Sequence, residues 1–191
     1  HRDLHSFPTR RSSDLQDLPR AFNPPEGCFA TANEDLNPFG RSKPINLPMG
    51  PYRGDRIRQL LAARDKFTVS DMCAMHFDVY SRQAELFMTV LKPLLPDTPE
   101  ATRLRDWDFK YTADSEGAYL FERFYEQLYR EVFGKGGLGE ATVDALREQT
   151  GAFIDFYHNF DRVLLAEKSA WFGGRSRDEI FREAASVALT T

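Results

Sequence analysis

The chain has 191 residues, 41% of them hydrophobic and 13% aromatic, so it is long enough to bury the core of one domain. Its formal net charge is -4, and no basic run could follow a phosphate backbone, which argues against a nucleic-acid partner. No apolar stretch approaches the roughly 20 residues that a membrane-spanning helix needs. The two cysteines, Cys28 and Cys73, are compatible with a disulfide in an exported protein or with buried thiols.

Residues 1–15 show neither helical nor strand periodicity. Arg10 and Arg11 could belong to a twin-arginine export signal, but no apolar segment follows them. A disordered basic tail is a second alternative. The run Phe7–Leu15, FPTRRSSDL, instead resembles the in-frame translation of a sequencing adapter. We therefore expect residues 1–15 to be a non-native, adapter-derived tail and the native sequence to begin near Gln16.

Residues 16–52 are rich in proline and glycine, which excludes a helix over most of this segment. One short run, Gly27–Asn33, is flanked by turn residues and predicts a strand. The residues that follow, Asp35–Pro51, predict a long loop. Loops of this length within a domain are usually functional or separated from the structure to which they belong.

Apolar residues recur at helical spacing from residue 53 onward, and residues 53–191 predict a helical body. A first helix is expected over Arg53–Arg64. Thr68 and Asp71 match a capping box, which would open a long helix ending near Lys92. The expected apolar stripe of that helix consists of Met72, Met75, Val79, Leu86 and Val90.

The second half of the body predicts further helices with recognisable ends. Pro99, after Thr98, suits the first position of a short helix toward Trp107. Ser115 suits the cap of the next helix, and the glycine-rich run Gly134–Gly139 should end it. The apolar residues expected to line that helix are Phe121, Phe124, Tyr125, Leu128 and Val132. Two more helices are expected over residues 140–165 and 177–189.

Several residues that could carry chemistry have simpler structural explanations. Gly134–Gly139 contains Gly-Lys but lacks the preceding strand and the following Ser or Thr of a phosphate loop, so it predicts a turn between helices. Cys73 and His76 would supply only half a metal site, and no second pair has suitable spacing. His158 lies among aromatic residues, which favours a place in or near the core over a role as a base. No Gly-x-Ser-x-Gly elbow is present.

A set of short motifs occurs in a fixed order along nearly the whole chain. They are Gly27-x-Phe29-x-Thr31-Ala32-Asn33, Pro51-Tyr52-Arg53, Arg56-Ile57-x-x-Leu60-Leu61, Thr68-x-x-Asp71-Met72, Asp78-x-Tyr80-Ser81, Trp107-Asp108 and Ala113-Asp114-Ser115. In this order and spacing they resemble the penicillin acylase family of N-terminal-nucleophile hydrolases, over roughly residues 26–189. The resemblance implies a mainly α-helical fragment of the large (beta) subunit, with one or two short strands, from a larger αββα fold.

The resemblance also implies a reaction and two site residues. In this family an N-terminal Ser, freed by autocatalytic cleavage, attacks an amide carbonyl, and its own α-amino group acts as the base. Asn33 matches the Asn whose side-chain amide binds the oxyanion, and Arg53 matches an arginine that supports the site. Each also has a simpler explanation, because Asn is a common turn residue and Arg53 could be an ordinary cation at a helix start. Glu34 stands where the family often has another Asn.

The chain departs from the family pattern in what it lacks. His1 cannot serve as the nucleophile, and we expect both the nucleophile and the small subunit to lie outside this chain, which alone should be inactive. No cofactor or metal is expected here, although the complete enzyme could bind calcium. The expected partners are a small acyl-amide substrate, the small subunit and the rest of the large subunit. The resemblance places the enzyme in the periplasm or outside the cell.

A non-enzymatic helical interaction module is the alternative function, in which the aromatic stripes would bury a partner. The two hypotheses differ in one geometric expectation. The enzyme requires Gly27–Asn33 to be a strand with Asn33 at its end and Arg53 within reach of it. An isolated module has no use for that arrangement.

Overall fold

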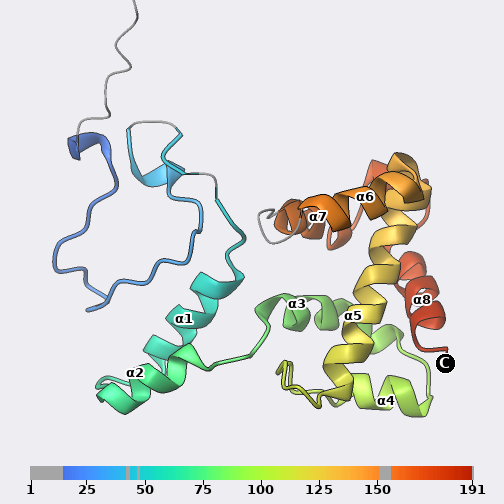
Figure 1. Cartoon of the computed structure of the whole chain (residues 1–191), viewed down its shortest axis with the longest axis horizontal. Coiled ribbons are helices and arrows are strands. Elements are labelled where there is room, and N and C mark those ends of the chain that lie inside the picture. Colours follow the sequence, from blue (N-terminus) through green and yellow to red (C-terminus); the bar gives the residue numbers. More distant parts are fainter. Residues whose placement is uncertain (1–14, 42–43, 47, 151–155, 191) are drawn as a thin grey trace, which may run out of the picture.

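The computed structural model describes residues 15–41, 44–46, 48–150 and 156–190 of the chain (Figure 1). Its regular structure is almost entirely helical, which confirms the predicted fold class. The α-helices are α1 (Tyr52–Ala62), α2 (Val69–His76), α3 (Arg82–Leu91), α4 (Pro99–Arg105), α5 (Glu116–Tyr129), α6 (Glu140–Thr150), α7 (Phe156–Leu164) and α8 (Arg177–Ala188). The 3₁₀ and π-helical segments are η1 (Leu15–Asp17), η2 (Asn37–Phe39), η3 (Lys92–Leu94), η4 (Arg130–Leu138) and η6 (Ala170–Phe172).

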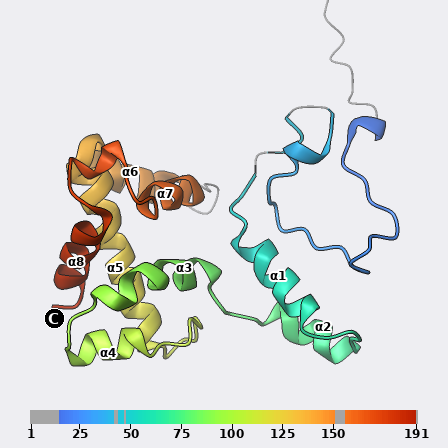
Figure 2. The ribbon, with the colours of Figure 1, turned by 180° about the vertical axis from the view of Figure 1, so that it is seen from behind.

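The helices form two groups in space. The irregular segment before α1 lies to one side together with α1 and α2, and the helices from α3 to α8 form a body on the other side (Figures 1 and 2). Within the body α5 is central and packs against α4 and α8. α1 packs against α3. This packing is one of the contacts that join the group containing α1 to the body.

The strand predicted over Gly27–Asn33 does not form. The backbone there has no ladder partner among the described residues, and it enters the left-handed region at both ends, with φ of +70° at Gly27 and +64° at Asn33. The β-pairing that the described residues contain is an isolated bridge between Tyr80 and Lys110. A strand needs a neighbour to pair its N–H and C=O groups, and a local sequence pattern does not show whether one is present.

The capping box at the start of α2 is confirmed. Thr68 Oγ1 accepts a hydrogen bond from the Asp71 N–H at 3.2 Å, and Asp71 Oδ2 accepts one from the Thr68 N–H at 2.9 Å. The long helix expected after it is wrong, because α2 ends at His76 and a new helix begins at Arg82. Ser81 caps that second helix, its Oγ accepting from the Ala84 N–H at 3.1 Å.

The apolar stripe predicted across this break is wrong for the same reason. Met72, Val79 and Leu86 are exposed. The face of α3 that packs inward instead carries Ala84, Phe87, Met88 and Leu91, all completely buried. An interruption between two helices resets the phase of the helical pattern, so residues before and after it no longer share a face.

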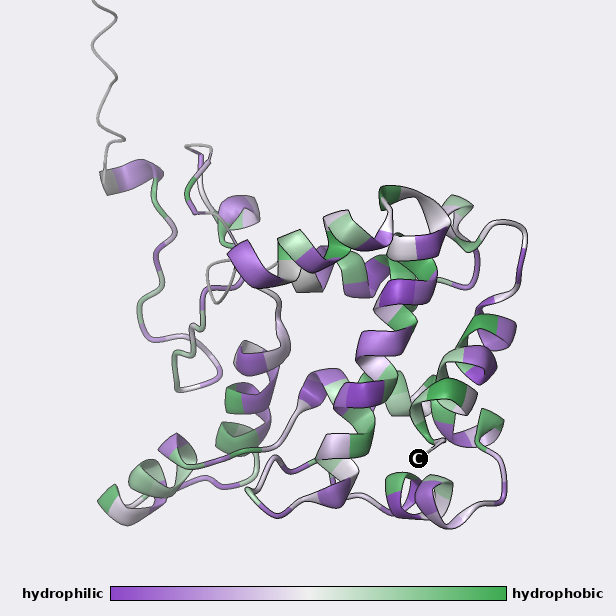
Figure 3. Ribbon diagram, turned by 45° about the vertical axis from the view of Figure 1, so that its right-hand side comes forward, coloured by the Kyte–Doolittle hydropathy of each residue, from purple (hydrophilic) through white to green (hydrophobic). Residues whose placement is uncertain are grey.

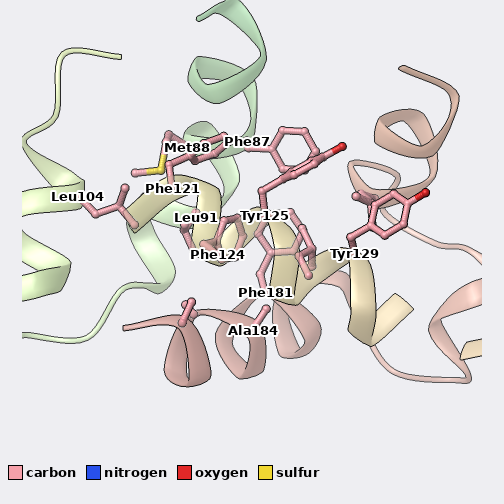
Figure 4. Close-up of a cluster of buried hydrophobic side chains, with 14 of the residues drawn as sticks. Phe87, Met88, Leu91, Leu104, Phe121, Phe124, Tyr125, Tyr129, Phe181 and Ala184 are labelled. Atoms are coloured by element: carbon pink, nitrogen blue, oxygen red, sulfur yellow. The ribbon is translucent and has the colours of Figure 1, made fainter. Parts of the chain in front are cut away.

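The core of the body forms around one face of α5. Ser115 caps this helix as predicted, its Oγ accepting from the Ala118 N–H at 3.2 Å. The apolar residues predicted to line the helix are all buried, namely Phe121, Phe124, Tyr125, Leu128 and Val132. Figure 4 shows Phe121, Phe124 and Tyr125 of this set beside Phe87 from α3 and Phe181 from α8. In Figure 3 the hydropathy of α5 alternates along the helix, as expected for an element with one buried face.

The glycine-rich run does not end α5 directly. The helix continues in π-helical geometry as η4, and the run ends at Gly139, which has φ of +87°. The single helix predicted over 140–165 corresponds to α6 and α7, and residues 151–155 between them lie outside the described residues. α8 matches the helix predicted over 177–189, with a capping box formed by Ser176 and Glu179.

Three other predictions concern the chain as a whole. The expected adapter-derived tail, residues 1–15, lies outside the described residues apart from Leu15. In the part of the chain that the structure describes, no helix has the length and apolar character needed to cross a membrane. Cys28 and Cys73 are free and exposed, so the structure contains neither the disulfide nor the buried thiols considered for them.

Candidate functional site

Asn33 and Arg53, the two predicted site residues, are hydrogen-bonded to each other. Arg53 is the second residue of α1, and its Nη2 donates to Asn33 Oδ1 at 3.0 Å and to the Ala32 carbonyl oxygen at 3.2 Å. A guanidinium group has no acceptor, so the oxygen of the Asn33 amide must be the atom that faces it. The NH₂ group of that amide consequently points away from Arg53, and within the described part of the chain it donates to no other group.

The backbone of Asn33 supports this orientation. Its φ of +64° lies in the left-handed region, which Asn tolerates better than most residues. Its carbonyl oxygen accepts from the Met49 N–H at 2.6 Å, so the chain that leaves Asn33 returns to it just before α1. The described residues of the predicted loop contain η2 and no other helix or strand. The two ends of the loop meet at the Asn33–Met49 hydrogen bond, next to Arg53.

Two asparagine side chains hold the loop in shape. Asn46 Oδ1 accepts from the Leu36 N–H at 3.2 Å, and its Nδ2 donates to the Glu34 carbonyl oxygen at 2.8 Å. Asn37 Oδ1 accepts from the Ile45 N–H at 2.6 Å. These amides satisfy backbone groups as a neighbouring strand would. Side-chain amides therefore supply much of the backbone hydrogen bonding in the described part of the loop.

Glu34 connects the Asn33 segment to α1. Its carboxylate accepts from the Ala32 N–H and forms an ion pair with Arg58 at 2.9 Å, and Arg58 also contacts Asp55 at 3.0 Å. Burial raises the pKa of Glu34, but the hydrogen bonds from backbone N–H groups and from Arg58 outweigh it and bring the pKa below its ordinary value. The negative charge next to Asn33 is thus balanced by Arg58.

Two further motif residues form an ion pair that the sequence analysis did not assign. Arg56 Nε and Nη2 donate to the two carboxylate oxygens of Asp78 at 2.8 and 2.7 Å, and its guanidinium lies 4.3 Å from the centre of the Tyr80 ring. The Arg56 hydrogen bonds lower the pKa of Asp78 despite its partial burial. This pair fastens α1 to the connection between α2 and α3. Arg56 and Asp78 both occur in the ordered motifs, and this was the sequence feature that could have identified the pair.

A fully buried carboxylate that the sequence analysis missed lies behind α1. Asp161 on α7 accepts hydrogen bonds from Tyr52 Oη at 2.8 Å, Gln83 Nε2 at 2.8 Å and Tyr125 Oη at 2.7 Å. Burial, and then the charge of Asp161, raise the pKa values of Tyr52 and Tyr125 well above their ordinary range. Both hydroxyls therefore remain protonated donors. The donors come from α1, α3 and α5, which no local pattern could reveal.

Two cavities meet at the start of α1. One, of about 340 Å³, is lined by Gly50, Tyr52, Arg53, Tyr129 and His158 among others. The other, of about 720 Å³, shares Tyr52 and Arg53 and extends along α1. Asn33 and Arg53 are themselves exposed on this chain.

Of the residues considered above as metal ligands or a base, Cys73 and His76 lie on α2 and His158 lies on α7. His158 is half-buried at the wall of the smaller cavity, with its ring edge-on to Tyr52 at 5.7 Å, which agrees with the boundary position expected for it. Cys73 and His76 are exposed on α2. Among the described residues no group of three or more His, Cys, Asp or Glu side chains is arranged to hold a metal ion.

The comparison with known proteins agrees with this arrangement of motifs. The family model of penicillin amidase matches residues 9–191. The Penicillin acylase 2 proenzyme of Pseudomonas sp. (strain SE83) is 29% identical over 182 residues, an alignment that covers 90% of this chain and 23% of that protein. The chain thus spans about a quarter of the length of this relative. Because the family model matches nearly all of it, the chain belongs to the penicillin amidase family.

Proposed function

We propose that this chain provides the oxyanion-binding segment of an acylase that hydrolyses a linear amide bond, with Asn33 as the donor and Arg53 as its support. Membership of the penicillin amidase family supports the class of enzyme. The observation that carries the residue assignment is the hydrogen bond from Arg53 Nη2 to Asn33 Oδ1 at 3.0 Å, which directs the amide NH₂ outward. That NH₂ is the group an oxyanion would need.

The chemistry follows from the change in charge during the reaction. Attack of a nucleophile on an amide carbonyl places negative charge on the carbonyl oxygen, and a neutral donor already aimed at that oxygen stabilises the charge without reorienting. A flipped Asn33 amide would place its NH₂ against the positive guanidinium, so Arg53 disfavours that orientation. In this proposal an N-terminal Ser and its α-amino group come from another part of the enzyme, and the chain alone does not hydrolyse amides.

Asn33 is exposed to solvent on this chain, which would weaken it as an oxyanion donor. A donor in contact with bulk water stabilises an oxyanion less than one in a site from which water is excluded. We propose that the rest of the large subunit and the small subunit cover Asn33, and that the acyl-amide substrate is bound between them and this chain. By its family the complete enzyme would be exported to the periplasm or secreted.

The alternative of a non-enzymatic interaction module has weaker support. Exposed aromatic residues such as Phe22, Phe39 and Phe77 would suit a partner-binding surface, but they would equally be covered by other parts of a larger enzyme. The described residues do not form the strand that the enzyme hypothesis required at Gly27–Asn33, but they do bring Arg53 within hydrogen-bond distance of Asn33. The module offers no reason for an arginine that orients an outward-facing amide. The match of the family model over residues 9–191 also favours the enzyme.

Substitution of Asn33 by Asp and by Ala separates a catalytic role from a structural one. Asp tolerates the left-handed backbone and keeps an acceptor for Arg53, but an ionised carboxylate cannot donate to an oxyanion. The experiment uses the relative from Pseudomonas sp. with its matched segment replaced by this chain, and precursor processing reports whether the hybrid folds.

We expect both variants to lower kcat by about 10²–10³ with a smaller change in KM, because one oxyanion donor is lost. Asn23→Asp is the matched control, since Asn23 is also exposed and has a positive φ, of +46°, but lies outside the site. An Asn33→Asp hybrid with the activity of the control would show that Asn33 is only a turn residue.

A further inference from the structure

We infer that Asp161 is a positioning residue of the oxyanion site, which acts through Tyr52 to fix the first turn of α1 and so to aim Arg53 at Asn33. The inference rests on the proposed function, because the aim of Arg53 matters to catalysis only if Asn33 binds the oxyanion. Asp161 itself lies in the body, on a helix more than 100 positions later in the sequence than Arg53.

Asp161 has the properties of a rigid anchor. Its side chain is 0% exposed, and it accepts hydrogen bonds from Tyr52 on α1, Gln83 on α3 and Tyr125 on α5. A buried carboxylate is costly to desolvate, and its hydrogen bonds are of the stronger, charge-assisted kind. Donors that contact it are therefore held in place more firmly than by neutral partners. Tyr52 is the one of these three donors that belongs to α1.

The path from Asp161 to the site is short. Tyr52 and Arg53 are consecutive, and adjacent side chains on an α-helix diverge by about 100°. When Tyr52 reaches back to Asp161, Arg53 is consequently directed to another side, where it meets Asn33 at 3.0 Å. The Tyr52–Asp161 bond of 2.8 Å thus fixes the rotation of α1 about its own axis at the turn that carries Arg53.

A second contact with α7 supports this geometry. His158 and Asp161 are three positions apart and share one face of α7. A Cβ atom added to Gly50 would lie 3.0 Å from His158 Cβ, so the backbone entering α1 lies directly against this face. The Tyr52 ring meets the His158 ring edge-on, at an interplanar angle of 84°. α7 therefore contacts the residues on both sides of Pro51, namely Gly50 and Tyr52.

The test compares two single-atom deletions in the full 191-residue chain. Tyr52→Phe and Tyr125→Phe each remove one hydroxyl that donates to Asp161, at 2.8 and 2.7 Å, but only Tyr52 belongs to α1. The readouts are the side-chain NMR signals of Asn33 and Arg53 and the free energy of unfolding. If Asp161 positions Arg53, Tyr52→Phe shifts the Asn33 amide signals and abolishes the Arg53–Asn33 contact, whereas Tyr125→Phe leaves both unchanged.

Asp161→Leu, which has a similar size but no acceptor, should reproduce the spectral change of Tyr52→Phe, and adding Tyr52→Phe to Asp161→Leu should cause no further change. Should Asp161→Leu fail to fold, the two tyrosine variants still decide the question. Equal spectral changes in Tyr52→Phe and Tyr125→Phe, or none in Tyr52→Phe, would overturn the inference. Because these signals do not depend on catalysis, a failed oxyanion role and a failed positioning role give different results.

Discussion

Replacement of Arg53 by Met should reduce catalysis moderately, and the structure sets the size of the effect. Arg53 donates to Asn33 Oδ1, and in the proposed mechanism it only orients the amide, so the NH₂ donor remains when the guanidinium is removed. Met has a similar length and can fill the space beside Met49, which Arg53 Nη2 now contacts at 3.3 Å. The expected loss has two sources, the freedom of the amide to flip and the loss of a charge-assisted hydrogen bond.

Free flipping between two orientations leaves the donor correctly placed half the time, which is a factor of about two or about 0.4 kcal/mol. A hydrogen bond to a charged group contributes about 1.5–3 kcal/mol when buried, but both groups here are exposed, which reduces it to about 1 kcal/mol. Together these predict a decrease in kcat of roughly two- to tenfold. This is smaller than the decrease of about 10²–10³ expected for Asn33→Ala.

The assay is steady-state hydrolysis of an amide by the hybrid acylase, with kcat and KM measured for each variant. Arg64→Met is the matched control, because Arg64 is an exposed arginine that follows α1 and pairs with Asp71 instead. A decrease as large as that of Asn33→Ala would mean that Arg53 itself contacts the oxyanion. An unchanged kcat would mean that Arg53 does not orient Asn33 at all.

Three further variants test the surroundings of the site and the core. The pKa of Glu34 is lowered on folding, so its carboxylate stabilises the fold above the ordinary Glu pKa of about 4.3 and loses this effect as pH falls through the folded pKa. The difference in urea unfolding free energy between wild type and Glu34→Gln should therefore shrink on acidification, and a constant difference would contradict this. In Gly50→Ala the new Cβ would lie 3.0 Å from His158 Cβ, so the start of α1 should be displaced. The free energy of unfolding should fall by about 1–3 kcal/mol. A crystal structure of the variant in which the start of α1 has not moved would refute this prediction. Phe121→Ala empties a fully buried position and should lower the unfolding free energy by about 3–5 kcal/mol, whereas a loss below 1 kcal/mol would show that the core is not packed as described.

Local signals in the sequence were reliable where a few neighbouring residues decide the structure. The predicted caps at Thr68 and Ser115 each use a side-chain oxygen that accepts from a backbone N–H three residues later, so the whole interaction is contained in the local sequence. The buried face of α5 was equally visible in its helical spacing. The pairing of Asn33 with Arg53 came instead from the order of motifs, because no local pattern joins residues 20 positions apart.

Predictions failed or were missing where distant residues decide. Residues 77–81 leave the helix because Ser81 can cap a new one and because Tyr80 bridges to Lys110, which the pattern of apolar residues does not include. The absence of a strand at Gly27–Asn33 depends on a partner that the described residues do not supply. The sequence analysis did not single out Asp161, because its donors Tyr52, Gln83 and Tyr125 come from other helices.

The central claim, that the Asn33 amide binds the oxyanion, is tested most directly by the affinity for a tetrahedral anionic analogue of the reaction intermediate. Calorimetry on the hybrid acylase would compare this analogue with the carboxylic acid product, for wild type and for Asn33→Ala. If Asn33 is the donor, its loss raises the Kd of the analogue by about 10²–10³ and leaves the Kd of the product nearly unchanged. An equal change in both Kd values, or no change in either, would contradict the assignment.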